Sequence, residues 1–259
     1  MRRRERALAA LDPVMARLVA AAGPCTLEPQ LEQPPFAALA SAIAHQQLNG
    51  VVARRIVERL TALYAPAEFP EPAQLAATSD ATLRAVGLSF AKIRALRDLA
   101  DKVLSGVVPA AAELHTLENE MIIERITQVR GIGRWTVEML LMFRLGRPDV
   151  LPVDDFGICN GFRLAYGLKG MPRPRALAEF GARWAPHRSL AAWYLWRAVD
   201  LAREKKLPPA ARAPKLALKQ TRVQPAAGKQ GARRKRTAKR KGSARKRARR
   251  PLLEQSAPV

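Results

Sequence analysis

The 259-residue sequence is poor in several features that would define other classes of protein. Its only cysteines, Cys25 and Cys159, are too few for a disulfide framework or a four-thiolate cluster, so no iron–sulfur centre is expected. Charged residues interrupt every apolar run well short of about 18 residues, which predicts no membrane span. The basic N-terminus lacks the continuous apolar segment of a signal peptide. These absences together favour a reducing compartment, and we expect a cytoplasmic protein, nucleoid-associated if the source is bacterial.

Acidic residues are also scarce, and this scarcity is uneven along the chain. The chain carries 45 Lys and Arg against 22 Asp and Glu, a formal net charge of +23. Residues 205–259 alone hold 19 of the basic residues and one acid, Glu254. This segment has no aromatic residue and is rich in Ala and Pro, so it cannot bury enough apolar surface to fold. We therefore predict a folded domain over residues 1–206 and a disordered Lys/Arg-rich tail over 207–259, suited to a polyanion such as nucleic acid.

Within residues 1–206 the hydrophobic pattern is almost entirely helical. Strand signals are nearly absent, which predicts an all-α fold. A good N-cap pair, Ser79–Asp80, starts one short helix, and the turn Gly87–Leu88–Ser89 separates this helix from the next. The longer helices are expected over residues 5–20, 118–129, 173–184 and 188–206, with two more within 36–64 that meet at Asn49–Gly50.

The most informative stretch is Ile126–Phe156, which reads as a helix, a glycine turn, a second helix and a proline-containing loop. Gly131 and Gly133 bracket Ile132, and glycine lets the backbone turn tightly and approach another surface closely. A helix that starts near Gly133 leaves its first amide groups without intrahelical partners, which makes a ready site for a phosphate. The loop that follows carries two adjacent aspartates, Asp154 and Asp155.

Four separated motifs make the chain resemble the helix-hairpin-helix superfamily of base-excision DNA glycosylases. They are ITQVRGIGRWT from Ile126, AIAHQQLNG around His45, VGLSFAKIRAL around Phe90 and RSLAAWYLWRAVDLA around Leu195. Within the superfamily the chain is most similar to the DNA-3-methyladenine glycosylase II family, which repairs alkylated bases. The resemblance covers roughly residues 30–204 and implies two helical lobes with the active site between them. It also implies a partner, double-stranded DNA with a damaged base, and a monomer.

The resemblance places Asp155 on the catalytic aspartate of the family. Hydrolysis of an N-glycosidic bond develops positive charge on the deoxyribose, and a buried carboxylate stabilises that charge or orients the attacking water. By the residues alone, Asp154 and Asp155 could instead cap the next helix, and both roles can hold together. An architectural DNA-binding protein without catalysis is the alternative function.

The resemblance also implies a substrate pocket formed by Trp135, Phe156 and Trp196. Aromatic rings favour the electron-poor rings of cationic alkylpurines. Bifunctional relatives have a lysine at the position of Trp135, and tryptophan cannot form their Schiff base. A monofunctional enzyme that leaves an intact abasic site is therefore expected. Met139 and His187 replace aromatic residues of relatives, so the range of lesions stays open.

DNA contacts are expected from two turns. A wedge must fill the gap left by an extruded base, and the alignment places Gln47 there, with Leu48 as the alternative. The hairpin residues Gly131, Ile132, Gly133 and Arg134 are expected to grip a phosphate. We expect no cofactor and no metal centre, although a monovalent cation could be held by hairpin carbonyls as in relatives.

Overall fold

The computed structural model describes residues 2–31 and 34–210, and every regular element in them is a helix. This confirms the all-α prediction. The expectation of a disordered tail falls almost wholly outside the described residues. In chain order the elements are α1 (Arg3–Leu11), α2 (Pro13–Ala22), α3 (Pro35–His45), α4 (Gly50–Ala62), α5 (Pro72–Ala77), α6 (Asp80–Ala85), α7 (Phe90–Leu104), α8 (Ala111–Leu114), α9 (Asn119–Ile126), α10 (Arg134–Phe143), α11 (Phe156–Ala165), α12 (Pro174–Gly181), η1 (Ala182–Trp184) and α13 (Arg188–Arg203).

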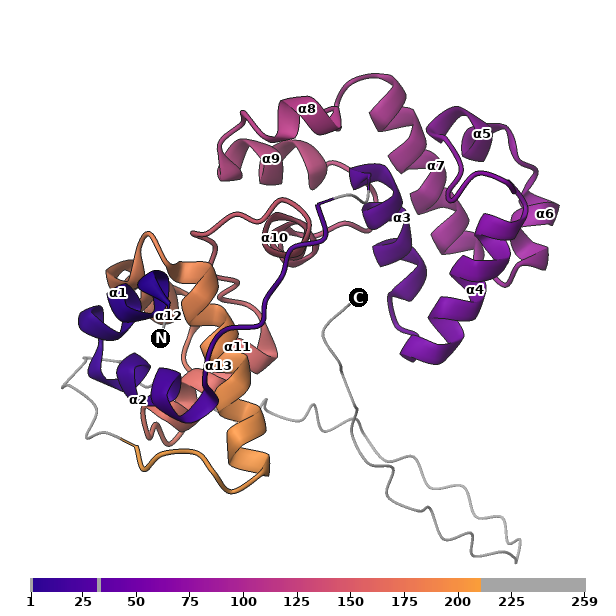
Figure 1. The fold of residues 1–259 in the computed structure, drawn as a ribbon. Coiled ribbons are helices and arrows are strands. Elements are labelled where there is room, and N and C mark those ends of the chain that lie inside the picture. The colour runs from indigo at the N-terminus through magenta and orange to yellow at the C-terminus, as the bar shows by residue number, and fades with distance from the viewer. Residues whose placement is uncertain (1, 32–33, 211–259) are drawn as a thin grey trace, which may run out of the picture. The chain divides into compact units, whose positions relative to one another are not determined.

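The helices form two packed groups (Figure 1). In one group α13 packs on α11 and α2, and α1 lies against α2, so the first and last helices of the described chain share one core. In the other group α7 packs on α3, α5 and α6, while α10 packs on α9 and α3. Buried side chains from both groups join in one hydrophobic cluster. The connection between α10 and α11 carries the aspartate doublet from the second group to the first.

The single helix expected over residues 5–20 is instead two helices. The chain turns at Asp12, whose φ and ψ of −154° and 119° are extended, and Pro13 begins α2. Asp12 is 3% exposed and accepts hydrogen bonds from Val14 N (2.8 Å), Tyr166 Oη (2.7 Å) and Trp184 Nε1 (3.1 Å). Burial raises the pKa of Tyr166 far above its ordinary value, and Asp12 adds to the shift. The corner between α1 and α2 is therefore fixed by partners more than 150 residues away.

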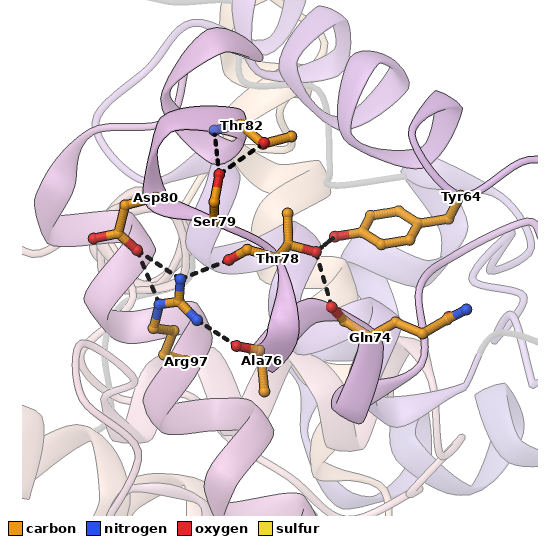
Figure 2. A network of polar contacts seen from close by, with 8 residues as sticks. All are labelled: Tyr64, Gln74, Ala76, Thr78, Ser79, Asp80, Thr82 and Arg97. Carbon is orange, nitrogen blue, oxygen red and sulfur yellow. Dashed lines mark hydrogen bonds and ion pairs between the residues drawn. The ribbon is translucent and has the colours of Figure 1, made fainter.

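One arginine holds the α5–α6 junction against α7 (Figure 2). The Arg97 guanidinium donates to the carbonyls of Ala76 and Thr78 and to the carboxylate of Asp80, the latter two at 2.6 Å. Ser79 caps α6 as expected by accepting from Thr82 N at 3.1 Å. The sequence pattern did not predict α5 or the four-residue α8, since both are too short to show a helical period.

Candidate active site

The glycine turn between α9 and α10 forms the expected hairpin. Gly131 has a φ of +79°, which favours glycine, and Ile132 between the two glycines is only 4% exposed. Gly133 is the N-cap of α10 and no side chain caps this helix, so its first amide groups are available to an external anion. Asp98 fixes the turn from α7, because its Oδ2 accepts from Arg130 N at 2.6 Å.

The side chain of Arg134 is engaged inside the protein. Its guanidinium forms ion pairs with Glu120 on α9 at 2.5 Å and with Glu138 one turn along α10 at 3.0 Å. At the hairpin, Arg134 therefore offers its backbone amide rather than a free guanidinium.

Glu138 is a buried carboxyl that the sequence pattern did not single out. It is 4% exposed on a helix whose neighbouring residues are apolar. Burial raises its pKa from 4.5 to about 7, against the opposing effect of Arg134 and with a smaller contribution from the charge of Asp154. A lone charged residue in an apolar helical segment is the signal that would have identified it.

The side chain of Asp155 is the polar centre of the site. Its Oδ1 accepts from the backbone N of Ile158 at 2.7 Å, so Asp155 is the N-cap of α11. The same Oδ1 accepts from Trp196 Nε1 at 2.8 Å, and Oδ2 accepts from Trp135 Nε1 at 2.9 Å. Three neutral N–H donors thus fix the carboxylate, and such charge-assisted bonds are short and strong. The neighbouring Asp154 is exposed, so the geometry favours Asp155 of the two.

The two predicted pocket tryptophans lie on either side of this carboxylate and reach it through their indole N–H groups. Trp135 comes from the first turn of α10 and is 45% exposed. Trp196 comes from the middle of α13, where its ring stacks on Phe143 with centroids 5.9 Å apart and planes at 26°. The resemblance implies an aromatic pocket role for both tryptophans, in contact with an alkylpurine. The structure gives both indoles a further role, as hydrogen-bond donors to Asp155.

The third predicted pocket residue, Phe156, is not brought into this cluster. It is 75% exposed at the start of α11, and no aromatic pair among the described residues includes it. Its place in the pocket stays a prediction. Of the other two tryptophans, Trp184 is fully buried, and the half-buried Trp193 packs edge-on against Tyr194 with ring centroids 4.8 Å apart.

The candidate wedge lies in the turn between α3 and α4. Gln47 is exposed and has a φ of +59°, an uncommon conformation for a residue other than glycine, and Leu48 is 40% exposed. Both candidates are therefore accessible, and the choice between them stays open. The preceding Gln46 donates from Nε2 to the carbonyl of Gly131 at 2.8 Å, which links this turn to the hairpin.

A lysine on α7 contacts the end of α3, directly before the same turn. Lys92 on α7 donates to the carbonyl of Ala44 at 2.6 Å, and burial lowers its pKa. A cation at the C-terminal carbonyls of α3 complements the dipole of that helix. Sequence reasoning missed both Gln46 and Lys92, because their partners are 85 and 48 residues away.

Residues 2–31 and 34–210 show neither a metal-binding cluster nor a membrane-spanning helix. Nowhere in them do three or more His, Cys, Asp or Glu side chains gather as a metal ion would require. No helix of this part is long and apolar enough to cross a membrane. The expected cation at the hairpin stays a prediction, although Gln46 already occupies one of the hairpin carbonyls.

Comparison with known proteins agrees with this geometry. Residues 40–187 match the model of the HhH-GPD superfamily base excision DNA repair proteins. The chain is 39% identical over 196 residues to DNA-3-methyladenine glycosylase 1 of Schizosaccharomyces pombe, covering 75% of this chain and 86% of the relative.

Two solved structures are similar over most of the described residues. One is the 3-methyladenine DNA glycosylase of S. pombe in complex with abasic DNA, with a TM-score of 0.68, 38% identity and coverage of 78% of this chain and 98% of that one. The other is a DNA-3-methyladenine glycosidase of Bacillus halodurans, with a TM-score of 0.73, 34% identity and coverage of 79% and 92%. The matched residues include the hairpin, both aspartates and Trp135, and by these similarities the chain belongs to the HhH-GPD superfamily of base excision DNA repair proteins.

Proposed function

We propose that this protein is a monofunctional DNA glycosylase of base excision repair. It extrudes alkylated purines of the 3-methyladenine type from duplex DNA, hydrolyses the N-glycosidic bond and leaves an abasic site. The observation that carries the proposal is Asp155, a half-buried carboxylate fixed by three N–H donors between the hairpin helix and α11. The relatives named above are glycosylases for 3-methyladenine by name.

In the proposed reaction the bond between the sugar C1′ and the base nitrogen breaks, and the bonding electrons leave with the base. A cationic alkylpurine departs as a neutral molecule, so the leaving group needs no proton from the enzyme. Positive charge develops on the deoxyribose, and the negative charge of Asp155 stabilises it. Water then adds to C1′ and gives up a proton, with Asp155 Oδ2 as the more available acceptor because it receives one hydrogen bond and Oδ1 receives two.

The tryptophan at position 135 supports hydrolysis without strand cleavage. A lyase needs an amine to attack the sugar, and the side chain nearest to Asp155 from α10 is an indole. Sodium borohydride should therefore trap no covalent adduct between the protein and abasic DNA. An adduct would instead support a lyase.

The DNA is held at the two turns that Gln46 links. The amide groups at the start of α10 bind a phosphate, while Gln47 or Leu48 fills the gap left by the extruded base. We propose a monomer that needs no cofactor and acts in the cytoplasm, at the nucleoid in a bacterium. A monovalent cation at the remaining hairpin carbonyls would add to the phosphate site.

The basic tail adds sequence-independent affinity for DNA in this proposal. Each Lys or Arg that neutralises a phosphate releases a counterion, so the tail should steepen the salt dependence of binding. Truncation after Ala210 tests this and keeps the contact between Arg17 and the carbonyl of Pro209. Unchanged affinity and an unchanged salt slope would contradict it.

The decisive experiment compares base release by the wild type, Asp155→Asn and Asp154→Asn from methylated duplex DNA, measured by mass spectrometry. Asparagine still offers an oxygen to Ile158 N, so α11 keeps its cap while the negative charge is lost. We expect Asp155→Asn to lower 3-methyladenine release by at least about a hundredfold with DNA binding retained. The exposed Asp154 should tolerate the same change.

Two results would overturn the proposal in different ways. Full release by Asp155→Asn would move the catalytic role to another residue. If the wild type released no base from any of several lesions while still binding DNA, the protein would be a binding protein without catalysis.

A further inference from the structure

Gly157 lies on the first turn of α11, two residues after the catalytic aspartate. A Cβ built at this position would lie 2.8 Å from Trp196 Cδ1, 3.0 Å from Trp196 Nε1 and 3.1 Å from Asp155 Oδ1. Real Cβ atoms essentially never approach another heavy atom to within 3.0 Å. The side chains of Trp196 and Asp155, which are hydrogen-bonded to each other, therefore occupy the space that a Cβ at residue 157 would need.

The backbone does not require glycine at this position. Gly157 lies within a regular helix and is absent from the positive-φ glycines among the described residues. Glycine is a weaker helix former than alanine, because it loses more backbone freedom on folding. Its presence in α11 thus has a local cost that must be offset by the contact it permits.

The indole of Trp196 cannot move away from residue 157 without breaking its hydrogen bond to Asp155. The ring of Trp196 is stacked on Phe143, and its Nε1 is already 2.8 Å from Asp155 Oδ1. An added methyl group at residue 157 would push on Cδ1 and Nε1, the edge that makes this bond. A second glycine one turn later, Gly161, has a different role, because a Cβ there would lie 1.9 Å from the backbone oxygen of Leu195 and would separate the two helices.

We propose that Gly157 is a positioning residue of the active site, whose lack of a side chain lets Trp196 donate to the catalytic carboxylate of Asp155. Its effect on the reaction passes through the indole, and it touches no substrate itself. This inference rests on the proposed function for its catalytic consequence. The geometric part stands without it.

The first test reads the indole directly in the protein without DNA. Four tryptophans give four indole N–H signals in a ¹⁵N-labelled sample, and the signal lost in Trp196→Ala identifies residue 196. In Gly157→Ala this signal should move upfield as its hydrogen bond lengthens, while the signals of Trp184 and Trp193 stay in place. A Trp196 signal unchanged in Gly157→Ala would overturn the proposal.

The second test reads the reaction under single-turnover conditions. Losing one hydrogen bond to a charged group should slow 3-methyladenine release about 10- to 100-fold in Gly157→Ala, with the Kd for DNA unchanged. In the Trp196→Ala background the same substitution should change the rate less than about threefold, because the two changes remove the same interaction. Equal effects in both backgrounds would overturn the proposal.

Two controls keep the test decisive. Gly170→Ala adds a methyl group where no atom lies within 4 Å and should leave the rate unchanged. If Gly157→Ala fails to fold, Gly157→Ala/Trp196→Ala should fold again, and a double variant that stays unfolded would refute the role of the indole. A wild type that releases no base would refute the proposed function, while the indole signals would still decide the role of Gly157.

Discussion

Replacing Trp135 by phenylalanine separates two roles of this side chain. Phenylalanine keeps an aromatic face but removes the N–H that donates to Asp155 Oδ2 at 2.9 Å. A hydrogen bond to a charged group contributes about 1.5 to 3 kcal/mol, and the lower end applies here because Trp135 is 45% exposed and water can replace its donor. At about 1.4 kcal/mol per tenfold change in rate, Trp135→Phe should slow base release roughly tenfold.

The assay is single-turnover release of 3-methyladenine from methylated duplex DNA, beside the Kd for abasic DNA. If Trp135 acted only by stacking on the extruded base, phenylalanine would retain most of that contact and the rate would hardly change. Trp193→Phe is the matched control, because Trp193 is half-buried against Tyr194 and is not among the hydrogen-bond donors to Asp155. A rate for Trp135→Phe within about twofold of the wild type would refute the donor role.

Three further predictions concern the neighbouring elements. The pKa of Glu138 is raised from 4.5 to about 7, so the folded state binds the proton more tightly. The free energy of unfolding should therefore fall by about 3 kcal/mol as pH rises from 4.5 through 7, and Glu138→Gln should remove most of this dependence in urea titrations. Gln46→Ala removes the bond to Gly131 and should weaken binding to abasic DNA roughly fivefold in fluorescence anisotropy, with little change in Tm. Arg97→Ala should lower the free energy of unfolding by about 2 kcal/mol, since two backbone carbonyls and a carboxylate lose their donor.

Exposed residues on the same helices or a neighbouring one provide matched controls for these variants. Glu124 on α9 and Arg94 on α7 are exposed, so Glu124→Gln should keep the pH dependence and Arg94→Ala the stability of the wild type. A pH dependence that persists in Glu138→Gln, or an Arg97→Ala protein as stable as Arg94→Ala, would contradict the respective prediction. For Gln46→Ala, unchanged DNA affinity would show that the hairpin keeps its geometry without this link.

Much of the fold follows from patterns that are local in the sequence. Helical periodicity and caps placed α3, α4, α7, α9, α10 and α13, because hydrophobic spacing and N-cap chemistry act within a few residues. The prediction of one helix over residues 5–20 is wrong at Asp12–Pro13, where a proline at the first helical position marks a new helix. That corner is held by Tyr166 and Trp184, and no local pattern reveals partners so far along the chain.

The candidate site, like the fold, has features that follow from local sequence and features that follow from long-range packing. The glycine hairpin follows from local sequence, while Asp155, Trp135 and Trp196 follow from the motifs that resemble the glycosylase superfamily, because each motif has fixed local spacing. Three further facts come from the three-dimensional packing: both indoles donate to Asp155, Phe156 lies apart from them, and Gly157 leaves room for Trp196. These contacts depend on the packing of α11 against α13 and on the distance between α11 and α10. Such distances are set by the whole core, so no stretch of sequence encodes them alone.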